Sequence, residues 1–211
     1  MAEPLLRVEG LAKRYTRGRL RPQVTFSLAA DFTVAGPGIV GVMGPNGSGK
    51  TTLFELITGS NRPSGGSVRI AGQDIHGVKT RERDRLAIHY HQSYQVRHFS
   101  AHRPDFLLQP ATSDWPLVHL FDEPQFNTQD GYIGFMLDFF RSLRERGRLV
   151  FLCLHPNEPF HVDILRESCE RFLFVQQGTV TEAPDFGTLV ADPRVRSYLG
   201  ALAPPLASSR A

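Results

Sequence analysis

The sequence predicts an α/β fold with a mainly parallel sheet and an antiparallel β portion at the N-terminal end. Short apolar runs of strand length alternate with segments whose apolar residues recur at helical spacing. Polar residues stand where several of these runs end, as they do at the carboxyl edge of a parallel sheet. The first 75 residues differ, since their β-type runs are separated by Gly and Pro turns.

In the first half of the chain, residues 39–43 are the clearest strand, because the run is apolar except for Gly41 and resembles a strand covered on both faces. A helix over 51–57 follows and ends near Gly59. Around these two segments we expect, in chain order, a strand at 5–8, two short β-type runs within 24–34, a hairpin from 67–70 and 74–75, a charged helix at 81–86 and a strand at 88–90.

In the second half, residues 117–121 and 149–154 are again continuous apolar runs and predict buried strands. A helix over 130–145 is indicated by apolar residues at helical spacing, namely Ile133, Met136, Leu137, Phe140 and Leu143. The remaining expected elements are a helix at 161–169, a strand at 172–175, a turn at Gln177 and Gly178, and a helix at 195–199.

Length and composition suit one soluble domain, which we expect at residues 1–200, followed by a disordered tail at 201–211 that is rich in Ala, Pro and Ser. A net charge of +3 is too small to indicate a nucleic-acid or membrane partner by itself. We find no signal peptide and no apolar stretch of spanning length, so a cytoplasmic protein is expected. Cys153 lies in an apolar run and is predicted to be a buried thiol, which suits a reducing compartment.

The strongest motif directly follows the strand at 39–43 and fits the phosphate-binding pattern GxxxxGK[ST]. It comprises Gly44, Pro45, Asn46, Gly47, Ser48, Gly49, Lys50, Thr51 and Thr52. In such a P-loop, glycines let the backbone N–H groups turn toward phosphates, and the dipole of the following helix favours the anion. Lys50 is expected to reach the β and γ phosphates and Thr51 to bind Mg²⁺. A chance match is the alternative, but a strand before the motif and a helix after it argue against one.

A pair of carboxylates follows the strand at 117–121. Asp122 stands at the strand end, where a Mg²⁺ bound by Thr51 needs a further ligand. Glu123, its neighbour, is a candidate base that orients or deprotonates an attacking water. Taken alone, the pair could equally cap a strand-to-loop junction.

Together, the segments GPNGSGKTT, LVHLFDEP and LCLH resemble the ATP-binding-cassette (ABC) ATPases, the nucleotide-binding subunits of ABC transporters. The resemblance covers most of the chain and implies a P-loop NTPase core that binds ATP and Mg²⁺. It implies that Tyr15 stacks on adenine, that Gln92 links Mg²⁺ and the attacking water to the transporter contact, and that His155 contacts the γ-phosphate.

The chain departs from the family between the glutamine and the carboxylates. Gln92 and Asp122 are only thirty positions apart, so the helical subdomain is expected to be largely missing, with 93–115 as a shortened remnant. The family signature L-S-G-G-Q has its nearest counterpart in Phe99-Ser100-Ala101-His102-Arg103, where both glycines are replaced. In the family this signature binds the partner subunit's ATP. The resemblance therefore does not extend to the part of the site that one subunit supplies to the ATP of the other.

The leading hypothesis is therefore an Mg²⁺-dependent ATPase subunit that forms a homo- or heterodimer and acts with an integral-membrane permease on the cytoplasmic face. A second hypothesis is an adaptor that binds ATP, hydrolyses it weakly and pairs with a normal cassette. A nucleic-acid motor is a third, supported only by a basic run that we expect to be a solvated loop: Lys13, Arg14, Arg17, Arg19 and Arg21. Six further histidines show no metal-ligand spacing and are interpreted as incidental: His89, His91, His98, His102, His119 and His161.

Overall fold

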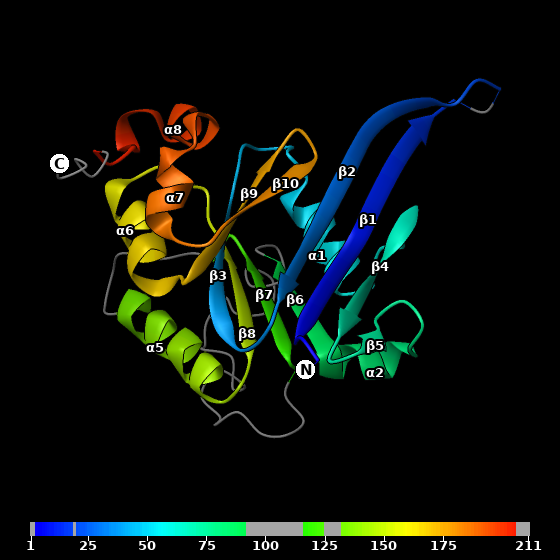
Figure 1. Ribbon diagram of the computed structural model, residues 1–211, viewed down its shortest axis with the longest axis horizontal. Helices are drawn as coiled ribbons and strands as arrows, with labels where there is room; N and C mark the ends of the chain where they lie inside the picture. Colours follow the sequence, from blue (N-terminus) through cyan, green and yellow to red (C-terminus); the bar gives the residue numbers. More distant parts are fainter. Residues whose placement is uncertain (1–2, 19, 92–115, 125–131, 206–211) are drawn as a thin grey trace.

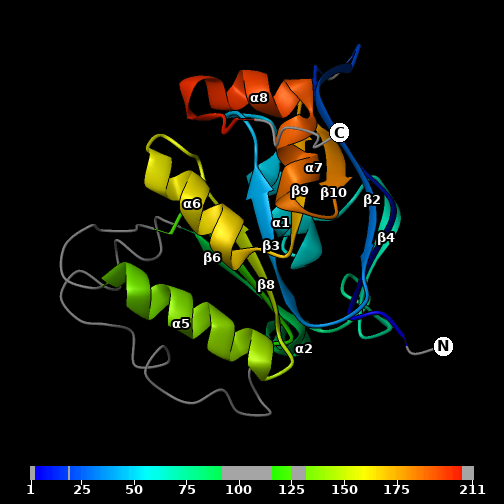
Figure 2. The ribbon, with the colours of Figure 1, turned by 60° about the vertical axis from the view of Figure 1, so that its left-hand side comes forward.

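A computed structural model describes residues 3–18, 20–91, 116–124 and 132–205 of the chain. The described strands form one mixed ten-stranded sheet in the order β5-β4-β1-β2-β10-β9-β3-β8-β7-β6, with helices on both sides (Figures 1 and 2). The predicted fold class, an α/β core with an N-terminal antiparallel portion, is confirmed. The predicted remnant at 93–115 lies outside the described residues.

The N-terminal portion is antiparallel and pairs β1 (Leu6–Arg17) with β2 (Gln23–Val34) and with β4 (Gly65–Ile70), which in turn pairs with β5 (Gln73–Asp74). Figure 1 shows β1 and β2 as a long hairpin that extends away from the rest of the sheet. The expectation of a basic loop was wrong for Lys13, Arg14 and Arg17, because β1 runs on to Arg17. The expected break within 24–34 was also wrong, since β2 is continuous over twelve residues.

The other part of the sheet, from β9 to the edge strand β6, is parallel. It contains β9 (Arg171–Gln176), β3 (Gly38–Met43), β8 (Leu149–Cys153), β7 (Val118–Asp122) and β6 (Ala87–His91). Every residue of β3, β7 and β8 is buried, as the unbroken apolar runs predict. Because these strands point the same way, their carboxyl ends lie at one edge of the sheet.

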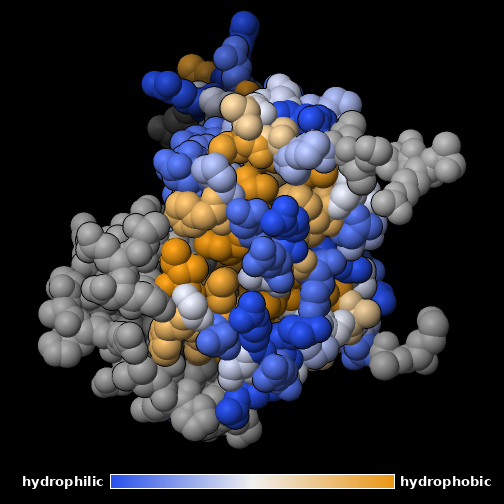
Figure 3. Space-filling model, turned by 90° about the vertical axis from the view of Figure 1, so that its left-hand side faces the viewer, coloured by the Kyte–Doolittle hydropathy of each residue, from blue (hydrophilic) through white to orange (hydrophobic). Residues whose placement is uncertain are grey.

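Helices divide the interior into two cores, one on each face of the sheet. The first contains α1 (Lys50–Ile57), with α2 (Thr80–Leu86) at its edge. The second contains α5 (Tyr132–Glu145), α6 (Pro159–Ser168), α7 (Phe186–Ala191) and α8 (Pro193–Leu199). β3 serves both cores, because Val40 and Val42 pack in the first and Ile39 and Met43 in the second. Figure 3 shows apolar side chains gathered on the face of the second core.

Two elements near the C-terminus were not expected from the sequence. The strand β10 (Thr179–Ala183) pairs with β9 after the turn at Gln177 and Gly178, and α7 begins where the Asp185 side chain accepts a hydrogen bond from Thr188 N at 2.7 Å. Both are short and only partly buried, so neither has a continuous apolar run. A short 3₁₀ helix covers Gly200–Leu202, and the structure describes the chain to residue 205, so only 206–211 of the predicted tail lie outside the described residues. Among the described helices, none has both the length and the apolar character needed to span a bilayer.

His119 is fully buried on β7, although strand interiors rarely hold imidazoles. Its Nδ1 lies 3.0 Å from the Tyr90 hydroxyl and its Nε2 lies 3.0 Å from the Pro116 carbonyl oxygen. The carbonyl requires a donor, so Nε2 carries the proton and Nδ1 accepts from Tyr90. Burial lowers the pKa of His119 to about 4, although the Pro116 carbonyl acts in the opposite direction.

We expect this imidazole to make stability depend on pH. With its pKa lowered from 6.5 to about 4, the folded state binds fewer protons than the unfolded state between these values. The stabilisation that the neutral His119 gives the folded state is therefore complete above pH 6.5. As the pH falls to 4, the free energy of unfolding decreases by about 3 kcal/mol. Urea unfolding at several pH values should show a steeper loss for the wild type than for His119→Gln, which keeps an amide donor for Pro116. Parallel pH profiles would contradict the assignment.

Candidate functional site

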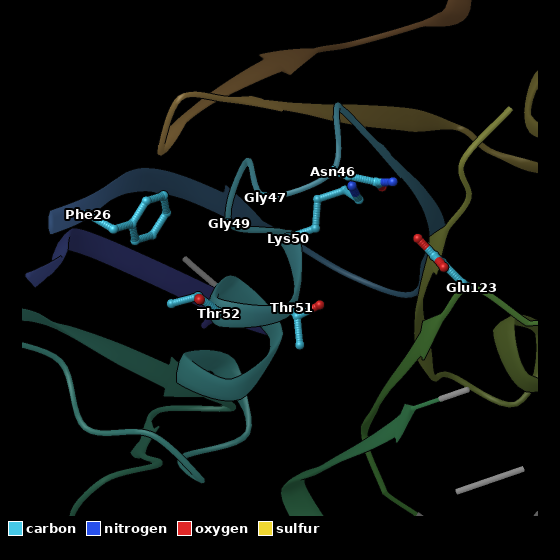
Figure 4. A pocket seen from close by; sticks show the side chains of 8 residues that line it. All are labelled: Phe26, Asn46, Gly47, Gly49, Lys50, Thr51, Thr52 and Glu123. Carbon is cyan, nitrogen blue, oxygen red and sulfur yellow. The ribbon is translucent and has the colours of Figure 1, made fainter. Parts of the chain in front are cut away.

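The sequence-predicted residues meet at the carboxyl edge of the parallel strands. The P-loop follows β3, Asp122 ends β7, and His155 lies just after β8, which pairs with both β3 and β7. A cavity of about 260 Å³ lies there, between the P-loop and Glu123 (Figure 4). Its lining comprises Phe26, Asn46, Gly47, Gly49, Lys50, Thr51, Thr52 and Glu123.

Two glycines shape the P-loop backbone. Gly44 has φ +150°, and a Cβ there would lie only 1.9 Å from the Val175 carbonyl oxygen. Gly49 has φ +112°, and its Cβ would lie 2.8 Å from Phe26 and 2.9 Å from Leu28. Any side chain at either position would push the loop away from β2 or β9, so the loop can hold this curvature only with glycine.

The buried polar groups of the loop suit an anion. Lys50 is 6% exposed, and its ammonium donates to the carbonyl oxygens of Gly44 at 2.7 Å and Pro45 at 3.0 Å. An ammonium has three N–H donors, so these bonds leave one for a phosphate oxygen. Ser48 is 3% exposed, and its buried Oγ has no hydrogen-bond partner among the described residues. Since a buried hydroxyl without a partner is unfavourable, Ser48 is also suited to a ligand oxygen.

The two predicted Mg²⁺ ligands are brought together from opposite sides of the site. Thr51 Oγ1 donates to Asp122 Oδ2 at 2.9 Å, and His89 Nε2 lies 3.3 Å from the same oxygen. Burial by itself would raise the pKa of Asp122, but hydrogen bonds from His89, Thr51 and Cys153 lower it below its ordinary value. Asp122 is therefore an anion at neutral pH, and a hydroxyl beside a carboxylate is a donor set suited to a hard divalent cation.

Glu123 leaves the strand direction immediately after Asp122. Its φ is +51°, in the left-handed region that non-glycine residues seldom adopt, and its N–H donates to the Cys153 carbonyl oxygen at 3.0 Å. This hydrogen bond to β8 keeps the strained backbone in place. As a result the carboxylate lies on the side of the cavity that faces Lys50, as Figure 4 shows, whereas Asp122 stays buried against α1.

His155 and Gln92 are placed less directly. His155 is exposed and does not line the cavity, and its Nδ1 lies 2.9 Å from the Tyr198 hydroxyl of α8. Sequence reasoning did not single out Tyr198, because a tyrosine in a C-terminal helix carries no motif of its own. Gln92 lies outside the described residues, one position beyond β6.

The aromatic residue that reaches the cavity is Phe26 rather than Tyr15. The two are direct partners across β1 and β2, with ring centroids 6.2 Å apart. Tyr15 accepts a hydrogen bond from Asn61 Nδ2 at 2.7 Å and has Lys13 Nζ 5.1 Å from its ring centre, whereas Phe26 lines the cavity. Alternation along β2 could have indicated Phe26, but only the cross-strand register with β1 places it.

The other described histidines contact different partners. His119 bonds to Tyr90 in the second core, and His161 packs on Phe160 of α6 at 4.0 Å between ring centres. His89, by contrast, contacts Asp122 and packs edge-on against Phe54. The described residues hold no group of three or more His, Cys, Asp or Glu side chains able to bind a metal ion together.

A second cavity, of about 300 Å³, lies near the amino end of β3 and is lined by residues 34–40, Glu170, Arg171 and Pro184. Ligands of parallel α/β sheets bind outside the carboxyl ends of the strands, so the P-loop cavity is the better candidate despite being slightly smaller.

Parts of the chain are similar to known proteins. A family model described as ABC transporter matches residues 29–127. The lipoprotein-releasing system ATP-binding protein LolD of Coxiella burnetii is 33% identical over 96 residues, which cover 45% of this chain and 40% of LolD. The chain thus spans less than half the length of the curated relatives that it matches.

Two solved structures share the fold. A nucleotide-free ATP-binding cassette from an ABC transporter superposes with a TM-score of 0.69 at 15% identity, covering 93% of this chain and 98% of that one. A dimeric ATP-binding cassette bound to ADP and phosphate superposes with a TM-score of 0.61 at 17% identity, covering 85% and 98%. At such identities the likeness is one of fold, and it agrees with the parallel sheet and P-loop described above.

Proposed function

We propose that this chain binds and hydrolyses ATP as a nucleotide-binding subunit that acts with a membrane permease. It is related to the ABC transporter ATPases in sequence and shares their fold. The observation that carries the proposal is the cavity in which Lys50, Thr51 and Glu123 meet. Each of these groups has a distinct chemical task there, and Phe26, which lines the same cavity, would contact the base in place of Tyr15.

Phosphate binding is assigned to the P-loop. The backbone N–H groups from Gly47 to Thr51 and the N-terminus of α1 would hold the β and γ phosphates, and Lys50 would donate its remaining N–H to a phosphate oxygen. The unpartnered Oγ of Ser48 and the side chains of Asn46 and Thr52 complete this polar surface.

Thr51 and Asp122 would hold Mg²⁺ together with phosphate oxygens, because their oxygens already lie 2.9 Å apart and Asp122 is ionised. When bound, the ion would neutralise part of the triphosphate charge. Gln92 remains a proposed third ligand.

Hydrolysis would start with Glu123, which takes a proton from a water as the water oxygen attacks the γ phosphorus. The bond between the γ phosphorus and the oxygen bridging to the β phosphate breaks, and ADP leaves with those electrons. The products are ADP and inorganic phosphate, with the proton passing from Glu123 to solvent or phosphate. Lys50 stabilises the negative charge on the phosphoryl oxygens, and His155 contacts the γ-phosphate.

The partners are proposed by relation to the family. An integral-membrane permease and a second cassette, identical or different, would complete the assembly on the cytoplasmic face of the membrane. A regulatory subunit that binds ATP, hydrolyses it weakly and pairs with a normal cassette is the alternative, because the sequence at 99–103 lacks the signature glycines.

Replacing Glu123 with Gln tests the hydrolytic role. The amide keeps the shape but cannot accept the water proton, so we expect kcat to fall by about 10²- to 10⁴-fold with ATP affinity unchanged. Phosphate release and equilibrium binding of a fluorescent ATP analogue measure the two effects. Glu145→Gln, at the exposed end of α5, is the matched control and should leave both unchanged. Undiminished turnover in Glu123→Gln would reject the assignment, whereas ATP binding without turnover in the wild type would favour the regulatory subunit.

A second pair of variants identifies the residue that contacts the base. Phe26→Leu keeps an apolar side chain but removes the ring, and we expect ATP affinity to fall about five- to a hundredfold, as for the loss of one stacked base. Affinity for tripolyphosphate, which has no base, should stay the same. A larger loss of ATP affinity in Tyr15→Leu would return the stacking role to Tyr15.

Recovery from membranes tests the partner. We expect the tagged chain, purified from its own cells after mild detergent extraction, to carry a multi-spanning protein at a fixed ratio that survives high salt. Mass spectrometry of the washed complex identifies it, and a Lys50→Ala chain controls for dependence on nucleotide. Recovery with soluble proteins alone, or with nucleic acid removed by salt, would contradict a transport role.

A further inference from the structure

Tyr198 connects the C-terminal helix to His155 of the candidate site. Its hydroxyl lies 2.9 Å from His155 Nδ1, and the two rings meet edge-on with centroids 5.8 Å apart. On its other side the ring packs against Phe174 of β9, with centroids 5.9 Å apart. The ring of Tyr198 therefore lies between His155 and the sheet residue Phe174.

The direction of this hydrogen bond follows from the protonation state of the phenol. Burial raises the pKa of Tyr198, so its hydroxyl keeps its proton. A protonated phenol is a hydrogen-bond donor, and the hydroxyl lies 2.9 Å from His155 Nδ1, so it can donate to that nitrogen.

This arrangement selects one form of the imidazole. A neutral histidine has one N–H and one acceptor nitrogen, and the bond at one nitrogen decides the state of the other. With Nδ1 accepting from Tyr198, the proton resides on Nε2. A γ-phosphate oxygen can only accept hydrogen bonds, so the Nε2–H form can contact it without the histidine becoming charged.

We propose that Tyr198 is a positioning residue for the proposed ATPase reaction. Its hydroxyl holds His155 in the Nε2–H form and directs that N–H toward the γ-phosphate. This inference rests on the proposed function for its consequence, although the form of the imidazole can be measured without any nucleotide. Through the contact of this hydroxyl with His155, α8 becomes part of the proposed site.

Helix packing by itself does not require the hydroxyl. α8 is anchored by buried Val195 and Leu199, and it begins where Asp192 Oδ1 accepts a hydrogen bond from Arg194 N at 2.8 Å. The ring of Tyr198 packs on Phe174 with or without its oxygen. A phenylalanine at 198 therefore removes the bond to His155 and keeps the apolar contacts.

The test compares the full-length wild type with Tyr198→Phe. In ¹⁵N-correlated NMR spectra at a pH where histidine is neutral, we expect His155 to be mainly in the Nε2–H form in the wild type. In Tyr198→Phe we expect a mixture of both forms, with the His155 signals assigned from their absence in His155→Ala. We also expect kcat/KM for ATP to fall about two- to tenfold, as for the loss of one hydrogen bond, with no change in affinity for ADP, which has no γ-phosphate.

A matched control lies in the same chain. Tyr90→Phe removes an equivalent hydrogen bond, of 3.0 Å to His119 Nδ1, inside the second core, and it should leave the His155 spectrum and ATP turnover unchanged. In a His155→Ala background, Tyr198→Phe should cost no further activity, because the tyrosine acts through the histidine.

Three outcomes would overturn the inference: an unchanged His155 spectrum in Tyr198→Phe, an equal loss of affinity for ADP and ATP, or additive losses in the double variant. A wild type that hydrolyses no ATP, alone or with its partner, would reject the proposed function instead. The NMR comparison would then decide by itself whether Tyr198 controls the imidazole.

Discussion

The parallel pairing of β3, β8 and β7 is the constraint on which the site depends. These strands lie side by side and point the same way, so the P-loop, His155 and Asp122, which stand at or just after their carboxyl ends, lie at one edge of the sheet. The hydrogen bond between Thr51 and Asp122 joins residues 71 positions apart in the chain and is possible only in this register. A slip of one residue in β7 would turn Asp122 to the opposite face and bring Phe121 toward α1.

Around this edge the structure holds polar groups in conformations that a free chain seldom adopts. Glu123 sits at positive φ and is tied to β8 by its N–H, Gly44 curves against β9, and Lys50 is buried among loop carbonyls. The two apolar cores offset these costs, because the central strands are buried on both faces. Rigid strands beneath a strained loop position several charged groups around one cavity.

Much of the fold was predictable because it depends on local patterns. Unbroken apolar runs identified β3, β7 and β8, and helical spacing identified α5. β10 and α7 lacked such patterns, since short, half-exposed elements take their stability from neighbours rather than from their own residues. The basic residues of β1 were predicted to form a loop for the same reason. Exposed strand residues show no burial pattern, and only pairing with β2 makes them a strand.

The sequence by itself determined the motifs: a P-loop pattern at 44–52, carboxylates at Asp122 and Glu123, and a strand-end histidine at His155, because these residue types at these spacings are local properties of the chain. Only the tertiary structure decided which groups meet. It placed Phe26 rather than Tyr15 on the cavity, set His89 and Cys153 beside Asp122, and joined Tyr198 to His155. The physical reason is that these contacts depend on strand order and register across the sheet, which bring together side chains that are distant in the chain.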